Sequence, residues 1–226
     1  MLKVLDQKRE TKDNFSLILE KPGGFNFYPG QYLDVELPVS DPVGKTRIFS
    51  ISSSPSEDYV MLTYKIGFSS YKKKLQGLKA GDIITSSHPA GTVVLDDSAP
   101  TVMLAGGIGI APHRSMIKWA LDRKLDLPIT LIYSNSDNDF IFKKELNSWQ
   151  KQSAGRRTKL SIHYIITGSN GRLTKDKFKK LYPLPFTLYP IFYLAGPPKM
   201  VDDFEVILLK LGVDSTNIRT DRFDGY

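Results

Sequence analysis

A nearly uniform apolar run, Thr101–Ala105, leads straight into a glycine-rich turn. Such a run is typical of a strand buried on both faces. The turn Gly106-Gly107-Ile108-Gly109 follows, and Pro112 fits the first turn of a helix, where its missing N–H costs nothing. A strand that passes through glycines into a helix lets backbone N–H groups approach a pyrophosphate. A tight turn without a ligand is the alternative, because Pro112 stands where the usual motif has its third glycine.

Strand-like and helix-like segments alternate from this point onward. Buried strands are expected at 129–133, 160–166 and 191–194, and helices at about 112–124, 140–150, 174–181 and 199–211. Thr174 has the position and side chain of a helix N-cap. The alternation predicts an α/β domain with a doubly wound parallel sheet.

The preceding part of the chain has a different rhythm. Short strand-like runs at 15–20, 31–37, 46–51, 59–66 and 82–86 are separated by turn residues, and a short helix is expected at 70–78. Regular short strands favour a small antiparallel β-barrel or sandwich. A polar stretch that ends in proline, Asp96–Pro100, marks the boundary. We therefore expect an antiparallel β-barrel domain over 1–97 and an α/β domain over 98–226.

Composition narrows the classes of protein. The chain has no cysteine and three histidines that are far apart in sequence, which excludes disulfides and thiolate metal ligands and gives no spacing for a metal site. No run approaches the roughly 18 apolar residues of a membrane span, so we expect a cytoplasmic protein.

Residues 1–97 carry 12 basic and 12 acidic residues, and residues 98–226 carry the whole net charge of +7. A basic half suggests an anionic partner, with a merely solvated surface as the alternative.

Three further motifs bear residues suited to ligands. Arginine, an aromatic ring and a hydroxyl follow one another in Arg47-Ile48-Phe49-Ser50, and we expect all three on one face of a strand. Arginine suits a phosphate and an aromatic ring suits a planar ligand, although an ordinary barrel strand is the alternative. Gly67–Tyr71 can present N–H and O–H groups to a phosphate or simply cap a helix. Ala195–Met200 again lies between a buried strand and a helix.

The order of these motifs resembles the ferredoxin–NADP⁺ reductase superfamily. In that family a barrel with an R-x-[YF]-S signature precedes a domain with G-G-x-G-I-A-P and a later G-P-P-x-M. The resemblance covers nearly the whole chain, from Pro29 to the tail. It implies an FAD-binding barrel followed by an NAD(P)-binding α/β domain.

The resemblance also implies residue roles for FAD. Arg47 contacts the pyrophosphate, Phe49 packs on the flavin and Ser50 donates toward flavin N5. The implied FAD-binding residues are Arg47, Ile48, Phe49, Ser50, Tyr64, Lys65, Ile66, Gly67, Ser69 and Ser70.

The implied NAD(P)-binding residues lie in the second half. They are Gly106, Gly107, Ile108, Gly109, Pro112, Ser134, Gly196, Pro197 and Met200. In the tail, Asp221 resembles the acid that helps proton movement, and either Phe223 or Tyr226 would cover the flavin. The implied catalytic set is therefore Ser50, Asp221, Phe223 and Tyr226. Many relatives have cysteine where this chain has Ala195.

The implied activity is hydride transfer from nicotinamide C4 to flavin N5, followed by electron transfer to an acceptor. Ferredoxin, flavodoxin, an oxygenase, free flavin or a ferric chelate could accept the electrons. The dense lysine runs at 72–74 and 175–180 are by default solvated helix faces, and docking of an acidic acceptor is the functional alternative. NADH is favoured over NADPH because Asp137 and Asp139 follow the second buried strand, although Arg114, Lys118, Arg156, Arg157 and Lys159 could reach a phosphate. A partner-dependent, non-catalytic electron-transfer subunit is one alternative. A nucleic-acid-binding barrel is a second, disfavoured by the balanced charge of residues 1–97.

Overall fold

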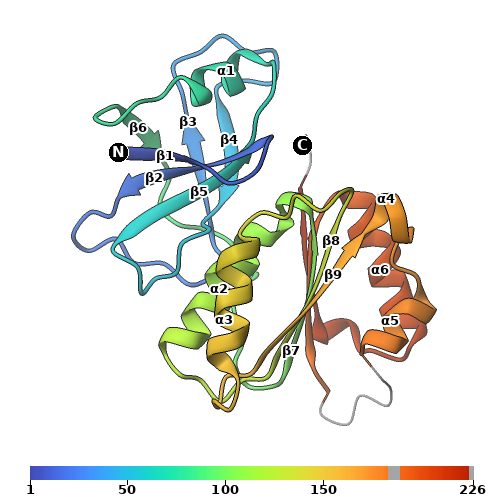
Figure 1. Ribbon diagram of the computed structural model, residues 1–226. Coiled ribbons are helices and arrows are strands. Elements are labelled where there is room, and N and C mark those ends of the chain that lie inside the picture. The colour runs from blue at the N-terminus through green and yellow to red at the C-terminus, as the bar shows by residue number, and fades with distance from the viewer. Residues whose placement is uncertain (183–188, 224–226) are drawn as a thin grey trace. The chain divides into compact units, whose positions relative to one another are not determined.

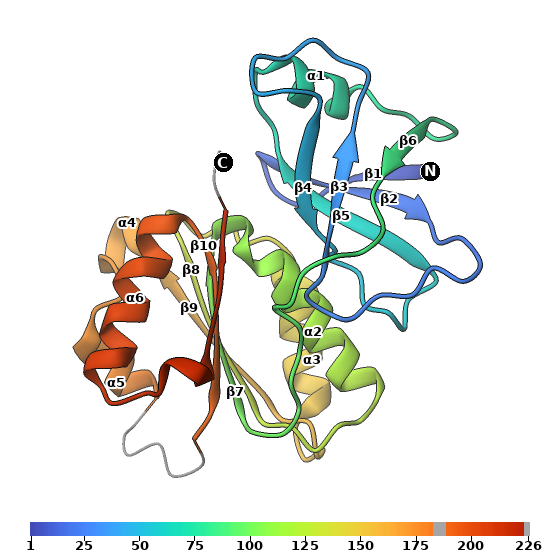
Figure 2. The ribbon, with the colours of Figure 1, turned by 180° about the vertical axis from the view of Figure 1, so that it is seen from behind.

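The computed structural model describes residues 1–182 and 189–223. They form two compact units (Figures 1 and 2). The first contains residues 1–95 and a short segment of a later helix, 114–119, and the second contains 96–113 and the described residues from 120 onward. None of the helices in the described ranges is long and apolar enough to cross a membrane.

The first unit is a curled, six-stranded antiparallel sheet with one short helix. Its elements are β1 (Leu2–Arg9), β2 (Asn14–Glu20), β3 (Tyr32–Glu36), β4 (Thr46–Ser50), β5 (Tyr59–Lys65), α1 (Ser70–Gln76) and β6 (Ile83–Ser86). The strand order is β4-β3-β6-β1-β2-β5. The two outermost strands are β4 and β5. The residues just after β4 join the middle of β5, through a bridge between Ile51 and Leu62 and through the bond from Ser52 N to Met61 O, which is 2.7 Å long. The barrel is therefore open along a seam between β4 and β5.

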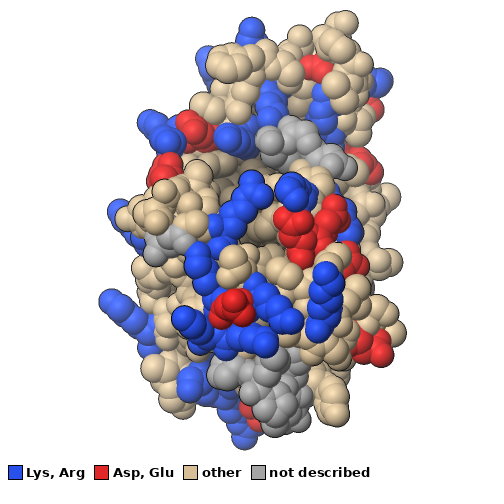
Figure 3. Space-filling model, turned by 90° about the vertical axis from the view of Figure 1, so that its right-hand side faces the viewer, with Lys and Arg blue, Asp and Glu red and all other residues tan. Residues whose placement is uncertain are grey.

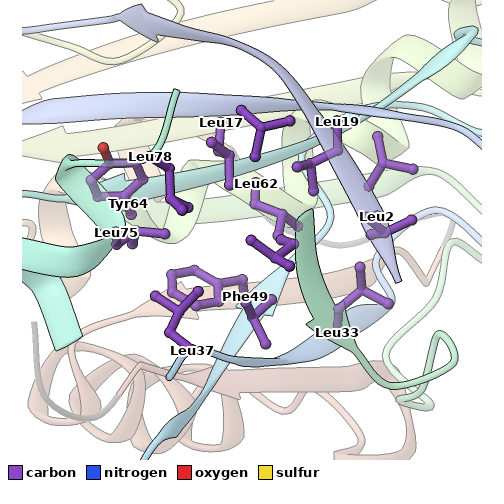
Figure 4. Packing of buried hydrophobic residues seen from close by; sticks show 14 of the residues in the cluster. Leu2, Leu17, Leu19, Leu33, Leu37, Phe49, Leu62, Tyr64, Leu75 and Leu78 are labelled. Carbon is purple, nitrogen blue, oxygen red and sulfur yellow. The ribbon is translucent and has the colours of Figure 1, made fainter. Parts of the chain in front are cut away.

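Apolar side chains fill the interior of this sheet. Figure 4 shows Leu2, Leu17, Leu33 and Phe49 among the side chains that point toward one another from different strands. Leu75 of α1 closes one end of the cluster. Buried and half-buried residues alternate along β3, where Leu33 and Val35 are fully buried, and this alternation gives the sheet its one apolar face.

The second unit is a five-stranded parallel sheet between two layers of helices. Its strands are β7 (Thr101–Gly106), β8 (Ile129–Asn135), β9 (Leu160–Ile166), β10 (Ile191–Gly196) and β11 (Ile218–Arg222), in the order β11-β10-β7-β8-β9. The helices are η1 (Gly107–Gly109), α2 (Ile110–Asp122), α3 (Lys143–Ser153), α4 (Thr167–Asn170), α5 (Lys175–Leu181), α6 (Pro198–Lys210) and η2 (Ser215–Asn217). Figures 1 and 2 place α2 and α3 on one face and α4, α5 and α6 on the other.

The predicted fold class is confirmed: an antiparallel barrel-like sheet precedes a doubly wound parallel sheet. Thr174 is an N-cap as expected, because its side chain accepts from Lys177 N. Two strands escaped prediction. In β1 only Leu2 and Val4 are buried among charged neighbours, and β11 has the polar sequence IRTDR. Backbone pairing with β10 makes β11 a strand, and its sequence has no apolar alternation that would predict one.

Two details of the expected elements were wrong. Helix α3 begins at Lys143, later than expected, because Phe142 adopts a left-handed conformation with φ 60°. In the first unit, Arg47 and Phe49 pair with Val35 and Leu33 and share their inward face, whereas Ser50 pairs with Tyr32 on the opposite parity. The side chains of Arg47, Phe49 and Ser50 therefore do not share one face, because successive side chains of a strand alternate.

Candidate functional site

A cavity of about 340 Å³ opens at the carboxyl ends of the parallel strands in the second unit. The chain crosses from β9 to the far side of β7 to form β10, so β7 and β10 are neighbours at the point where the strand order reverses. Open parallel sheets bind ligands at this point. Gly106 and Gly107 line the cavity from the end of β7, and Pro197 and Met200 line it from the start of α6.

The glycines at this edge have two different roles. Gly107 has φ +54°, and a Cβ there would meet nothing within 4 Å, so its backbone faces open space. A Cβ on Gly109 would lie 2.1 Å from Ala195 O, and one on Gly106 would lie 2.5 Å from Met200 Sδ. Gly107 therefore leaves the backbone open to a ligand, whereas Gly109 permits close packing of the turn against β10.

A buried tyrosine fixes this turn. Tyr133, at the end of β8, donates its hydroxyl to Gly107 O at 2.9 Å. Burial raises the pKa of Tyr133, so the phenol stays protonated and remains a donor. The sequence signals no such role for Tyr133, because a tyrosine in a buried strand is normally a core residue.

The cavity brings together some of the expected nucleotide residues. Gly106, Gly107, Ser134, Pro197 and Met200 line it. Ile108 and Gly109 are buried beside it, Pro112 lies in the first turn of α2, and Gly196 packs its Cα side against Gly106.

Three charged residues that the sequence did not single out also line the cavity. Arg172 follows β9, and Lys199 and Asp203 belong to α6. Lys199 Nζ lies 3.2 Å from Asp203 Oδ1, so these two charges pair on the surface. Arg172 comes from a loop after the third strand, and tertiary folding alone carries it to this edge.

The cations that were expected to reach a nucleotide do not line this cavity. Arg114 is instead buried in the first unit, where its guanidinium bonds both carboxylate oxygens of Glu57 at 2.9 and 3.0 Å and Ser52 O at 2.8 Å. Burial alone would raise the pKa of Glu57, but hydrogen bonds from Arg114 and its charge outweigh burial and lower that pKa. Arg114 is therefore a structural residue of the first unit.

The seam of the first unit gathers the expected flavin residues. Arg47, Ile48, Phe49 and Ser50 lie on β4, Tyr64 and Lys65 on β5, and Ile66, Gly67, Ser69 and Ser70 in the segment that leads into α1. Because β4 and β5 separate along most of their length, their facing backbone edges are open to a ligand. Ile48 is 55% exposed on β4.

Side chains already use part of this seam. Phe49 is buried and stacks with Tyr71, with ring centroids 6.3 Å apart. Ser69 is the N-cap of α1 and accepts from Lys72 N, so the capping alternative for this segment is confirmed. Arg47 Nη2 donates to Asp41 Oδ1 at 2.7 Å. Open strand edges with cations nearby suit FAD, provided that Arg47 exchanges its partner.

The expected tail residues lie at the end of the parallel sheet. Asp221 pairs with Ala195 in the β10–β11 register, and Phe223 N donates to Gly196 O at 3.0 Å. Both residues are half-buried. Tyr226 lies outside the described residues, so its assignment stays a prediction. Among the described residues, no group of three or more His, Asp or Glu side chains is placed to hold a metal ion.

Basic side chains gather on one face of the second unit. Figure 3 shows Lys and Arg side chains on the face that α4, α5 and α6 cover, around a hollow with acidic groups beside it. The α5 lysines 175, 177, 179 and 180 belong to this helix layer. The asymmetry of charge seen in the sequence is therefore partly concentrated on one helix.

Residues 103–205 match the family described as Oxidoreductase NAD-binding domain. Flavohemoprotein A of Dictyostelium discoideum is 26% identical over 97% of this chain and 59% of its own length. The toluate 1,2-dioxygenase electron transfer component of Pseudomonas putida is 28% identical over 87% of this chain and 59% of its own length. The chain thus spans less than two thirds of these relatives.

A solved structure shares the fold of the whole chain. Ferredoxin-NADP⁺ reductase from Plasmodium falciparum superposes with a TM-score of 0.80 at 18% identity, covering 98% of this chain and 95% of that one. These similarities confirm the resemblance that the order of motifs predicted.

Proposed function

We propose that this chain, which belongs to the ferredoxin–NADP⁺ reductase superfamily, is an FAD-dependent NAD(P)H reductase. The observation that carries the proposal is the cavity at the reversal of strand order, where the open backbone of Gly107 faces a space of about 340 Å³. This volume lies within the usual range of ligand cavities, which is roughly 300 to 1,000 Å³. FAD and NAD(P)H are the cofactors that this superfamily binds.

The nucleotide would be held mainly by backbone groups. Gly107 leaves its peptide groups accessible, and Tyr133 fixes its carbonyl from behind. Pro197 and Met200 give the cavity an apolar wall, on which a flat ring can rest. An apolar wall with a few placed polar groups is the usual composition of a cofactor site.

Flavin would be held along the seam between β4 and β5. When bound there, FAD would accept a hydride equivalent from the nicotinamide and release electrons to an acceptor. The chain's own part is to bind and orient both cofactors, with Ser50 as a hydroxyl donor on β4 and Phe223 near the end of β10. Ser50 is 9% exposed, so little water reaches that hydroxyl.

We propose NADPH as well as NADH as the nicotinamide cofactor, because a cation lines the cavity and the two acids that favour NADH do not. Asp137 Oδ1 accepts from Asn135 Nδ2 at 3.1 Å and from Asp139 N at 3.0 Å, so this carboxylate is used within its own loop. Neither acid lines the cavity, whereas Arg172 does. A guanidinium at the wall suits a phosphate, so we expect NADPH to be used at least as well as NADH.

The acceptor would be a redox protein or a small molecule. Two relatives are electron transfer components of oxygenases by name, the toluate 1,2-dioxygenase and xylene/toluene monooxygenase components of Pseudomonas putida. We propose that the lysines of α5 dock an acidic acceptor. Association would then weaken with ionic strength, because surface charges are screened within about 8 Å at physiological salt. A cytoplasmic location accords with this function and stays part of the proposal.

The test is an anaerobic titration of FAD-loaded protein with NADH and with NADPH, following the visible flavin band. Bleaching by either nucleotide supports the reductase function. FAD that binds without bleaching would point to the partner-dependent subunit, and failure to bind FAD would end the proposal.

A further inference from the structure

The seam of the first unit already contains an anion supplied by the chain itself. The carboxylate of Asp41, in the loop between β3 and β4, is 1% exposed. It accepts from Arg47 Nη2 at 2.7 Å, from Tyr71 N at 3.0 Å and from Val43 N at 3.1 Å. A guanidinium and backbone N–H groups around a buried carboxylate form the donor set that also suits a phosphate oxygen.

Arg47, the ion-pair partner of Asp41, also acts on a neighbouring lysine. Lys72 has a lowered pKa because of burial first and then because of the charges of Lys65 and Arg47. Lys65 and Arg47 therefore both act on Lys72 at this end of the seam, and Asp41 forms an ion pair with Arg47. A ligand with more negative charge than one carboxylate would match this cluster better.

The loop that carries Asp41 can leave without disturbing the core. Its neighbour Val43 is 78% exposed, and a Cβ on Gly44 would meet nothing within 4 Å. Arg47 also has contacts outside that loop, since Nη1 donates to Thr46 O at 2.8 Å and the guanidinium carbon lies 4.8 Å from the centroid of the Tyr71 ring. Within the loop, Nη1 donates to Gly44 O at 2.8 Å. Release of Asp41 therefore breaks polar bonds and exposes little apolar surface.

We propose that Asp41 is an internal substitute for phosphate, which the phosphate groups of a flavin nucleotide displace from Arg47. The exchange sets the preference of the seam between phosphorylated flavins and riboflavin, which has no phosphate to offer. This inference rests on the proposed binding of flavin at the seam. It assigns to Asp41 a role in ligand selection that is separate from hydride transfer.

The test compares the dissociation constants of FAD, FMN and riboflavin, from quenching of flavin fluorescence, in the wild type and in Asp41→Asn. Asn keeps the shape and the acceptor oxygen but removes the competing charge. We expect binding of FAD and FMN to tighten about tenfold, on the scale of one charge-assisted hydrogen bond, and binding of riboflavin to stay unchanged. Asp41→Ser gives a second variant in case Asn impairs folding.

Two controls separate ligand selection from general loop effects. Asp214 also accepts from a backbone N–H, Thr216 N at 2.8 Å, but has no ion pair among the described residues, so Asp214→Asn should change none of the three constants. Arg47→Gln should weaken FAD and FMN and spare riboflavin. Equal changes for riboflavin and FAD, or weaker FAD binding in Asp41→Asn, would overturn the inference.

A fourth probe, inorganic pyrophosphate measured by calorimetry, distinguishes this inference from the proposed function. If no flavin binds but pyrophosphate binds more tightly to Asp41→Asn than to the wild type, the exchange at Arg47 stands and the flavin function falls. If pyrophosphate binding is the same in both proteins, the exchange is wrong whatever the flavin does.

Discussion

The two proposed cofactor sites, the cavity of the second unit and the seam of the first unit, differ in whether backbone or side chains form them. The cavity of the second unit is shaped by backbone, with an open turn at Gly107 and close packing at Gly109. The seam of the first unit is lined by side chains that already bond one another, as Asp41 does to Arg47. The backbone at Gly107 faces open space, whereas Arg47 already has Asp41 as a partner. The edge of the second unit is therefore preformed, and we propose that the edge of the first unit requires an exchange.

This difference explains what the sequence could predict. Glycines after a buried strand constrain the backbone directly, so the amino-acid sequence alone predicts the turn at 106–109. The motif Arg47–Ser50 lies on a strand as predicted, but the prediction that its side chains share one face is wrong. Nothing in the sequence shows that Asp41 engages Arg47, because that pairing depends on the folded loop.

Residues from distant loops escaped prediction for the same reason. Arg172 and Asp203 reach the cavity from beyond the third and fourth parallel strands. The strand β11 is specified by pairing with β10 and carries no apolar alternation. Local patterns specify elements and turns, whereas the charged rim of a site depends on how the elements assemble.

Loss of the ion pair between Arg114 and Glu57 should show how much the stability of the first unit depends on side-chain bonds. Arg114→Met leaves the largely buried carboxylate of Glu57 without its ion-pair partner, and we expect it to lower the free energy of unfolding by about 3 kcal/mol. Urea unfolding followed by circular dichroism measures this. Adding Glu57→Gln should restore part of the loss. Arg222→Met is the matched control, because its pairs with Asp202 and Glu205 are exposed and should be worth less than about 1 kcal/mol.

The corresponding change in the second unit is Gly109→Ala. Its Cβ would lie 2.1 Å from Ala195 O, so the turn must shift, and we expect a loss of about 3 kcal/mol. Gly107→Ala should cost only about 1 kcal/mol, from its positive φ. It should raise the KM for the nucleotide instead. Equal loss of stability in both variants would contradict the division of roles between these two glycines.

A buried histidine predicts a pH dependence of stability. Burial lowers the pKa of His113 to about 3, and its Nδ1 has no hydrogen-bond partner among the described residues. The unfolded chain binds the proton more readily, so the contribution of His113 is complete above pH 6.5 and is lost as pH falls toward 3. The expected loss between pH 7 and pH 5 is about 2 kcal/mol.

Thermal or urea unfolding at both pH values checks this expectation. His113→Leu should remove most of the difference between pH 7 and pH 5. The control is His88→Gln, at an exposed position, which should leave the difference in place. If His113→Leu retains the full dependence, other groups cause it.

The smallest expected effect concerns the nucleotide. Arg172→Gln removes the cation at the wall of the cavity, and we expect kcat/KM for NADPH to fall about tenfold, or about 1.4 kcal/mol, with NADH little changed. Arg156→Gln is the control, because Arg156 does not line the cavity. An equal loss of kcat/KM with both nucleotides would show that Arg172 does not bind the phosphate that NADPH has and NADH lacks.

Hydride transfer from a nicotinamide to a flavin is the activity that we propose for this chain. Stopped-flow mixing of FAD-loaded protein with NADPH, unlabelled or dideuterated at C4, tests it under anaerobic conditions. We expect bleaching of the flavin band that deuterium slows severalfold, because the C4–hydrogen bond breaks in the observed step. A flavin that stays oxidised after prolonged contact with either NADPH or NADH would rule out the proposed hydride transfer.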